Sequence, residues 1–149
     1  MKTREEAVAC AMTWMDTPYI KGARVRGAGC DCETLIEAYL IEVGAAEEIV
    51  TGLYSGDWFC HANREIYFEG LSKYAACTWQ GQCLGTPPVQ PGDIAIFRAA
   101  GSKVYNHGCI ITGWPRALHS FDVGVRESRP ALHPLTAYMD MAVFDPWQK

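Results

Sequence analysis

The sequence predicts a single α+β domain, in which N-terminal helices pack on a C-terminal antiparallel β-sheet. In the first half of the chain apolar residues recur at helical spacing, whereas beyond Thr86 they form short runs separated by Gly, Pro and Asp. Helices that precede strands in this way are expected to cover one face of the sheet. The 149 residues, 49% of them hydrophobic, suffice for one core, so we expect one domain spanning residues 1–149.

The first predicted helix covers about residues 4–15. Thr3 and Glu6 form a capping-box pattern at its start. Apolar residues then recur at helical spacing until Asp16-Thr17-Pro18 ends the run. Residues 19–29 contain three Gly and no apolar period, so a loop is expected there.

The second predicted helix follows Asp31, its expected N-cap, and ends at Gly44. Cys32 is the first residue of its apolar stripe. At a helix N-terminus, unpaired backbone N–H groups and the positive end of the helix dipole stabilise a thiolate. We therefore expect Cys32 to be a reactive thiol with a lowered pKa. The stripe consists of Cys32, Leu35, Ile36, Tyr39, Leu40 and Val43.

A third helix and several strands complete the predicted fold. Asp57 is the expected cap of a helical pattern that runs from Trp58 to about Tyr74. Its inward-facing residues are predicted to be Phe59, Ile66, Tyr67 and Leu71. The apolar runs that predict the sheet are Ile94–Phe97, Cys109–Ile111, Ala117–His119, Gly124–Val125 and Met141–Phe144.

Composition argues against several classes of function. The net charge is -4 and Lys and Arg are scattered, whereas nucleic-acid surfaces carry clustered basic residues. The apolar stretches fall short of the ~20 residues that a membrane span requires, so no membrane insertion is expected. The start of the chain, Met1 to Glu6, leads into an amphipathic pattern and not an apolar leader. We therefore expect synthesis in the cytoplasm without a signal peptide.

The seven cysteines predict reduced thiols and no metal or cofactor. Their odd number and irregular spacing do not suit a disulfide framework, and Cys10, Cys60, Cys77, Cys83 and Cys109 are expected to be small buried side chains. Cys30 and Cys32 are separated by one residue, whereas zinc-binding pairs are separated by two to four and have a second matched pair. A small Cys/His metal module is therefore a minor alternative.

A thiol nucleophile needs a base, and two histidines qualify by position. His107 directly precedes a predicted strand, and His119 lies near the end of the next one. Adjacent strands of a hairpin can place two such side chains next to each other, which would supply a base and the group that orients it. The sequence thus predicts a thiol hydrolase with Cys32, His107 and His119. His61 and His133 are expected to have no catalytic role.

Five short motifs, in order and at matching spacing, resemble those of the NlpC/P60 cell-wall peptidases, which are papain-like cysteine hydrolases. The resemblance covers roughly Thr3 to Ser120, and the ordered series is more specific than any one motif. The motifs are Thr17-Pro18-Tyr19 with Gly22-Ala23, Asp31-Cys32, Pro91-Gly92-Asp93-Ile94, Asn106-His107-Gly108-Cys109-Ile110-Ile111 and Leu118-His119-Ser120.

The resemblance implies a papain-like fold and a role for each matching residue. Cys32 would be the nucleophile, His107 the general base and His119 the orienting residue, with Tyr19 near the oxyanion. Asp31 and Glu33 would lie on the substrate side of the site. The implied substrates are peptidoglycan stem peptides, cleaved at bonds of the D-Glu to diaminopimelate type, with no cofactor. The compact form looks most like members encoded beside phage and prophage tail genes, which implies tail proteins as partners and a virion or tail location.

The two residues that follow Cys32 depart from the family pattern. Glu33-Thr34 stands where the family has Ser-Gly, and a carboxylate beside the thiol would change substrate choice or raise the thiol pKa.

An amidase or acyltransferase on the same fold is one alternative function, because a fold does not specify the acyl group. A structural tail component with a latent or vestigial site is another.

Overall fold

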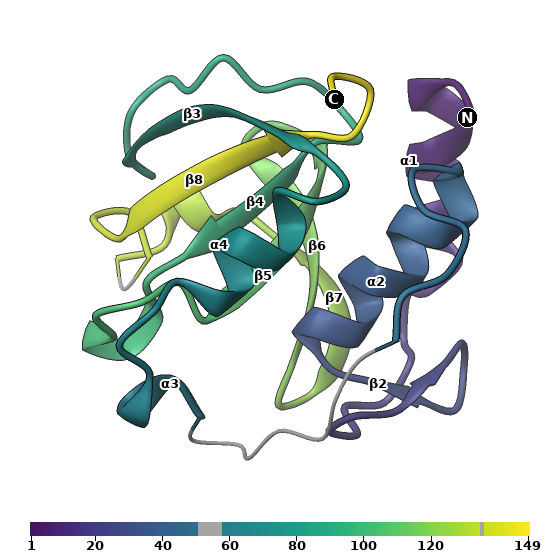
Figure 1. Cartoon of the computed structure of the whole chain (residues 1–149), viewed down its shortest axis with the longest axis horizontal. Helices are drawn as coiled ribbons and strands as arrows, with labels where there is room; N and C mark the ends of the chain where they lie inside the picture. Colours follow the sequence, from purple (N-terminus) through teal and green to yellow (C-terminus); the bar gives the residue numbers. More distant parts are fainter. Residues whose placement is uncertain (51–57, 135) are drawn as a thin grey trace.

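The computed structural model describes residues 1–50, 58–134 and 136–149, and it has the predicted α+β architecture. Helices α1 (Arg4–Met12) and α2 (Cys32–Val43) lie on one side of a six-stranded antiparallel sheet with the strand order β3-β8-β4-β5-β6-β7 (Figure 1). The strands are β3 (Ala76–Gln82), β4 (Ile94–Phe97), β5 (His107–Gly113), β6 (Arg116–Phe121), β7 (Gly124–Ser128) and β8 (Asp140–Asp145).

Helix α1 begins as predicted but ends earlier. Thr3 and Glu6 form the expected capping box. After Met12 the chain forms a tighter turn, in which the N–H of Trp14 donates to the carbonyl of Ala11, three residues back. Asp16 then adopts a left-handed conformation with φ of 65°, which turns the chain away. The three residues after Met12 are therefore a turn and not the last part of the helix.

Helix α2 matches its prediction and forms the centre of the core. The carboxylate of Asp31 accepts hydrogen bonds from the N–H groups of Glu33 and Thr34, and Gly44 ends the helix with φ of 86°. Leu35 and Tyr39 are completely buried against the sheet, where α2 packs on β5 and β6. No helix of the described residues is both long and apolar enough to cross a membrane.

The predicted third helix is wrong as a single element, since it is two short helices, α3 (Trp58–His61) and α4 (Ile66–Leu71). Glu65 sits between them in a non-helical conformation, because its carboxylate accepts the N–H of Tyr105 at 2.9 Å and pairs with Arg98 at 2.7 Å. Of the predicted inward residues, Tyr67 and Leu71 are buried, Phe59 is half-buried, and Ile66 is 56% exposed. The expected cap, Asp57, lies outside the described residues.

The predicted strand runs all fall within β4 to β8, but two parts of the sheet structure were not predicted. Strand β3 is an edge strand with the polar sequence Ala-Cys-Thr-Trp-Gln-Gly-Gln, and it exists because it pairs with β8. Strands β1 (Arg24–Val25) and β2 (Gly29–Cys30) form a small hairpin within the predicted loop. Neither shows the alternation that identifies a strand from sequence.

Apolar side chains cover both faces of the main sheet. The larger cluster lies between the sheet and helices α1, α2 and α4, and includes Tyr67, Ile110 and Phe144. The second cluster includes Phe97 and Cys109 on the other face, where the 3-10 helix η2 (Pro130–Leu132) contributes Ala131. The sheet is thus buried on both sides, and its second face contributes to the site described below.

One arginine ties the first helix to the last strand. Arg4 pairs with Asp93 at 2.7 Å and with Asp145 at 2.8 Å, and its guanidinium lies over the ring of Trp147 at 4.3 Å. Both aspartates are buried. Figure 1 shows the two chain ends on the same side of the molecule. The contacts of Arg4 with Asp145 and Trp147 join the N-terminal helix to the C-terminal segment there.

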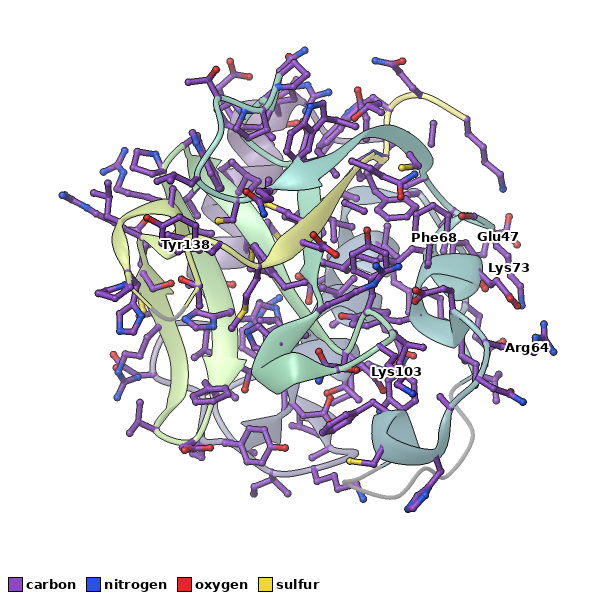
Figure 2. All side chains as sticks on the ribbon, turned by 90° about the vertical axis from the view of Figure 1, so that its left-hand side faces the viewer. Glu47, Arg64, Phe68, Lys73, Lys103 and Tyr138 are labelled. Carbon is purple, nitrogen blue, oxygen red and sulfur yellow. The ribbon has the colours of Figure 1, made fainter. Side chains whose placement is uncertain are left out.

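Arg4→Ala is therefore expected to lower the free energy of unfolding by about 3 kcal/mol, because two buried carboxylates lose their partner. Urea denaturation measures this change. Arg64→Ala is the matched control: Arg64 pairs with Glu69, but the two side chains are 71% and 46% exposed, so the loss should stay below about 1 kcal/mol. Equal losses for the two variants would contradict the structural role of Arg4 (Arg64 is labelled in Figure 2).

Candidate active site

Cys32, His107 and His119 come from three elements and line one cavity of about 1350 Å³. Cys32 is the first residue of α2, His107 is the first residue of β5, and His119 lies in β6. The Nε2 of His107 is 2.9 Å from the Nδ1 of His119, and the two rings meet edge to face with centroids 5.2 Å apart. The structure therefore places all three predicted residues on the wall of one cavity and joins the two histidines by a hydrogen bond.

The strand register explains how the two histidines meet. Strands β5 and β6 pair Ile110 with Leu118 and Ile111 with Ala117. Continuing this register places His119 opposite Cys109, so His107 and His119 are diagonal neighbours on one face of the sheet. Diagonal neighbours are within reach of long and aromatic side chains.

The expected low pKa of Cys32 is wrong for this structure. Cys32 is half-buried, and burial, followed by the carboxylates of Glu33 and Asp31, raises the pKa of its thiol to about 12. Backbone hydrogen bonds from Gly108 and from Cys32 itself act in the opposite direction but are weaker. Desolvation of a thiolate thus outweighs the stabilisation by the helix N-terminus.

The pKa values of the two histidines are lowered, whereas that of the Cys32 thiol is raised. Burial, and then the neighbouring His119, lower the pKa of His107 to about 3, and burial lowers the pKa of His119 as well. Both shifts favour the neutral imidazole. Burial thus favours a neutral thiol and neutral imidazoles in this site, and a neutral imidazole can accept a proton.

Gly108 lets the strand that carries His107 approach the helix that carries Cys32. A Cβ atom at this position would collide with the hydroxyl of Tyr67 and with Cδ1 of Ile36. The same hydroxyl donates to the carbonyl of Cys32 over 3.4 Å. The sequence predicted that Tyr67 is buried but not that its hydroxyl lies between Gly108 and the carbonyl of Cys32. The glycine directly after His107 was the one sequence feature that could have indicated this close approach.

Tyr19, Asp31 and Glu33 also line the cavity, in different situations. Tyr19 is 43% exposed, and burial together with the nearby Asp31 raises the pKa of its phenol. Asp31 caps α2, and its second carboxylate oxygen accepts the N–H of Gly22 at 2.7 Å, which fastens the preceding loop. The roles of these three residues toward a substrate stay predictions.

The remaining cysteines fit the prediction only in part. All seven are free thiols, and Cys30, Cys83 and Cys109 are buried as expected. Cys60 and Cys77 are exposed and Cys10 is half-buried, so the expectation for these three is wrong. Within the described ranges, no group of three or more His, Cys, Asp or Glu side chains is arranged to hold a metal ion.

Glu33→Gln should increase the rate at which Cys32 reacts with iodoacetamide at pH 8 by about threefold. Removing a carboxylate that raises the thiol pKa increases the thiolate fraction below that pKa, and exposed or half-exposed charge pairs change free energies by about 0.2–1 kcal/mol. Peptide mapping by mass spectrometry measures the rate at Cys32 separately from the other thiols. Glu47→Gln, beyond the far end of α2, is the control (Figure 2). An unchanged or slower rate at Cys32 would show that Glu33 does not raise its pKa.

Comparisons with known proteins identify the fold. No family model and no curated protein matches the sequence. Among solved structures, the chain is similar to the NlpC/p60 domain of the peptidoglycan hydrolase SagA, with a TM-score of 0.58 and 16% identity over 95% of this chain and 98% of that one. It is also similar to NlpC2 from Trichomonas vaginalis, with a TM-score of 0.66 and 15% identity over 98% of this chain. An NlpC/P60 family protein from Bacillus cereus ATCC 10987 gives a TM-score of 0.60 and 16% identity over 95%.

The chain spans nearly all of the SagA domain but only 47% of the Trichomonas chain and 39% of the Bacillus chain. At such low identity the likeness concerns the fold. The predicted α+β fold, with N-terminal helices packed on an antiparallel sheet, is confirmed, and it is the fold of NlpC/P60 structures.

Proposed function

We propose that this protein is a cysteine peptidase that hydrolyses peptide bonds in bacterial peptidoglycan stem peptides, of the D-Glu to diaminopimelate type. The observation that carries the proposal is the convergence of Cys32, His107 and His119 on one cavity, with the two imidazoles joined by a hydrogen bond of 2.9 Å. The likeness to the domain of the peptidoglycan hydrolase SagA supports the substrate class. The sequence motifs around the three residues support their roles.

In the proposed reaction, His107 removes the proton from the Cys32 thiol while the sulfur attacks the carbonyl carbon of the scissile amide. The raised pKa of Cys32 and the lowered pKa of His107 mean that the ion pair does not accumulate beforehand. Proton transfer therefore accompanies formation of the carbon–sulfur bond. The protonated His107 then gives its proton to the leaving amine, and a thioester on Cys32 remains.

Hydrolysis of the thioester uses the same groups. His107 takes a proton from water, the hydroxide attacks the thioester carbonyl, and the sulfur leaves and recovers a proton from His107. The acid product is released and the neutral site is restored. Tyr19, on the rim of the cavity, would donate a hydrogen bond to the oxyanion, and the carboxylate of Glu33 would favour substrates with a cationic group nearby.

His119 would select the tautomer of His107. If the Nε2–H of His107 donates to the Nδ1 of His119, the Nδ1 of His107 lacks a proton and can accept one from the thiol. The orienting partner in this arrangement is an imidazole, where other cysteine hydrolases use an amide or a carboxylate. His119 is thus proposed as the residue that positions the base.

Digestion of purified peptidoglycan tests the proposal. Wild-type protein incubated with walls of several peptide compositions should release fragments whose masses identify cleavage after D-Glu. Released fragments with another cleaved bond would correct the scissile bond. The absence of fragments from every wall type, with protein that remains folded, would favour the structural-component alternative.

The same family resemblance supports a location on phage or prophage tails, with tail proteins as partners. Mass spectrometry of purified virions or tail particles from a strain that encodes this chain tests that part. Detection of the chain at a fixed ratio to the tail proteins is the expected result, and its absence from intact particles would refute the tail assignment while leaving the peptidase chemistry unaffected.

A further inference from the structure

Aromatic side chains flank His107 on the floor of the cavity. In the sheet, His107 of β5 is the direct partner of Phe97 of β4, and directly paired residues project to the same face. The ring of Phe121 lies edge to face with His107, with centroids 5.6 Å apart. Both phenyl rings line the cavity. The surface beside the base is therefore apolar on both sides.

This floor is continuous with the second apolar cluster of the sheet. Phe97 and Cys109 belong both to the cavity wall and to that cluster, and Met139 packs against it while also lining the cavity. Phe97 and Cys109 are themselves buried, so the cavity wall at this point is the edge of the packed apolar cluster.

Two further large apolar side chains that line the cavity are exposed. Leu132 and Tyr138 come from the segment between β7 and β8, line the cavity, and are 64% and 68% exposed. Figure 2 shows Tyr138 on the loop that leads into β8, well away from Phe68 of α4 on the helical side of the sheet. Exposed apolar side chains gain free energy when a ligand removes them from water.

The positive charge of Arg98, which lines the cavity next to Phe97, is already paired within the protein. Arg98 lines the cavity and pairs with Glu65 at 2.7 Å and with Asp140 at 3.2 Å, while its guanidinium lies over Tyr105 at 4.7 Å. A charged group that approaches Arg98 would therefore have to compete with ion pairs that already exist, whereas an apolar group would not.

We propose that the cavity contains an apolar subsite, formed by Phe97, Phe121, Leu132, Tyr138 and Met139, which binds an aliphatic or aromatic group of the substrate next to the reacting acyl group. The volume of about 1350 Å³ exceeds the roughly 300–1,000 Å³ typical of small-ligand pockets, so there is room for more than a scissile amide. The proposal rests on the assignment of Cys32 and His107 as the reacting groups. It extends the substrate class from stem peptides to peptides or acyl derivatives that carry an apolar group.

Binding of acetyl-, butanoyl- and octanoyl-glycinamide to the full chain with Cys32→Ala, measured by calorimetry, tests the subsite without requiring turnover. We expect the affinity to rise by about fourfold for each added methylene until the subsite is filled. Leu132→Ser and Tyr138→Ser should each weaken binding of the octanoyl compound at least about fivefold and leave the acetyl compound unchanged. Both side chains are exposed, so neither variant threatens folding.

Val123→Ser is the matched control, because Val123 is 71% exposed in the turn between β6 and β7 and does not belong to the described cavity wall. Affinity that does not depend on chain length, or equal losses for Val123→Ser and Leu132→Ser, would overturn the subsite. Chain-length dependence together with no fragment release from any peptidoglycan would support the subsite and refute the stem-peptide substrate. Fragment release together with an affinity that does not depend on chain length would support the stem-peptide substrate and refute the subsite.

Discussion

Cys32→Ala is expected to abolish hydrolysis, with a fall in kcat/KM of about 10³-fold or more, while the protein remains folded. The residual rate without a nucleophile comes only from binding and from oxyanion stabilisation, so a large loss is the rule for such residues. Cys32 is half-buried at the first position of α2, and the cap of that helix is formed by Asp31. Removal of the sulfur should therefore leave the helix and the thermal midpoint nearly unchanged.

Fragment release from peptidoglycan, or turnover of one purified stem peptide, measures the effect. Cys60→Ala is the matched control, because Cys60 is an exposed free thiol on α3. It should retain full activity. Alkylation alone does not identify the nucleophile, since Cys60 and Cys77 are both exposed and compete for the reagent. Activity in Cys32→Ala within tenfold of wild type would show that another group performs the attack.

His107→Ala is expected to eliminate turnover, whereas the effect at His119 should depend on the replacement. His107 must accept and return a proton, and β5 supplies no substitute for it. His119 has only to hold the ring of His107 in one tautomer through the 2.9 Å hydrogen bond, which an amide can also do. His119→Asn should therefore retain measurable activity. His119→Ala should lose about 1–3 kcal/mol of barrier relative to wild type, because the His107 N–H is left without a partner.

Steady-state kinetics of these three variants and of His107→Asn on one stem peptide separate the two roles. His119→Ala should also change the pH profile, because His107 loses the hydrogen bond that holds its tautomer, whereas His119→Asn should keep the profile close to that of wild type. A residue needed only for folding would change stability and not the profile in either variant. If His107→Asn retains activity while His119→Asn is inactive, the roles of the two histidines are exchanged. If all four variants keep activity, neither histidine is the base.

Much of the helix that carries Cys32 is predictable from its own residues. Asp31 and Gly44 act within one turn of the helix ends, through a carboxylate that accepts backbone N–H groups and through a conformation that glycine adopts at low cost. The runs that became β4, β5 and β8 were predictable because they are apolar on both faces and separated by turn residues. Local chemistry was sufficient in these cases.

Long-range contacts decided where prediction failed. Glu65 breaks the third predicted helix because its carboxylate binds Tyr105 and Arg98, more than thirty residues away in the chain. Strand β3 is too polar to be recognised by itself and is a strand because β8 offers it a partner. In both cases the deciding hydrogen bonds join segments that sequence patterns treat separately.

The chemistry of the candidate site divides in the same way. The sequence by itself determined that a cysteine begins α2 and that two histidines lie on neighbouring strands, since these follow from helix capping and strand order. Only the tertiary structure decided that burial raises the pKa of the thiol and that the histidines meet diagonally at hydrogen-bonding distance. The physical reason is that a helix terminus acts over one turn of the chain, whereas desolvation depends on every segment packed around a group. Gly108 and Tyr67, which bring β5 against α2, supply part of that packing and come from distant parts of the sequence.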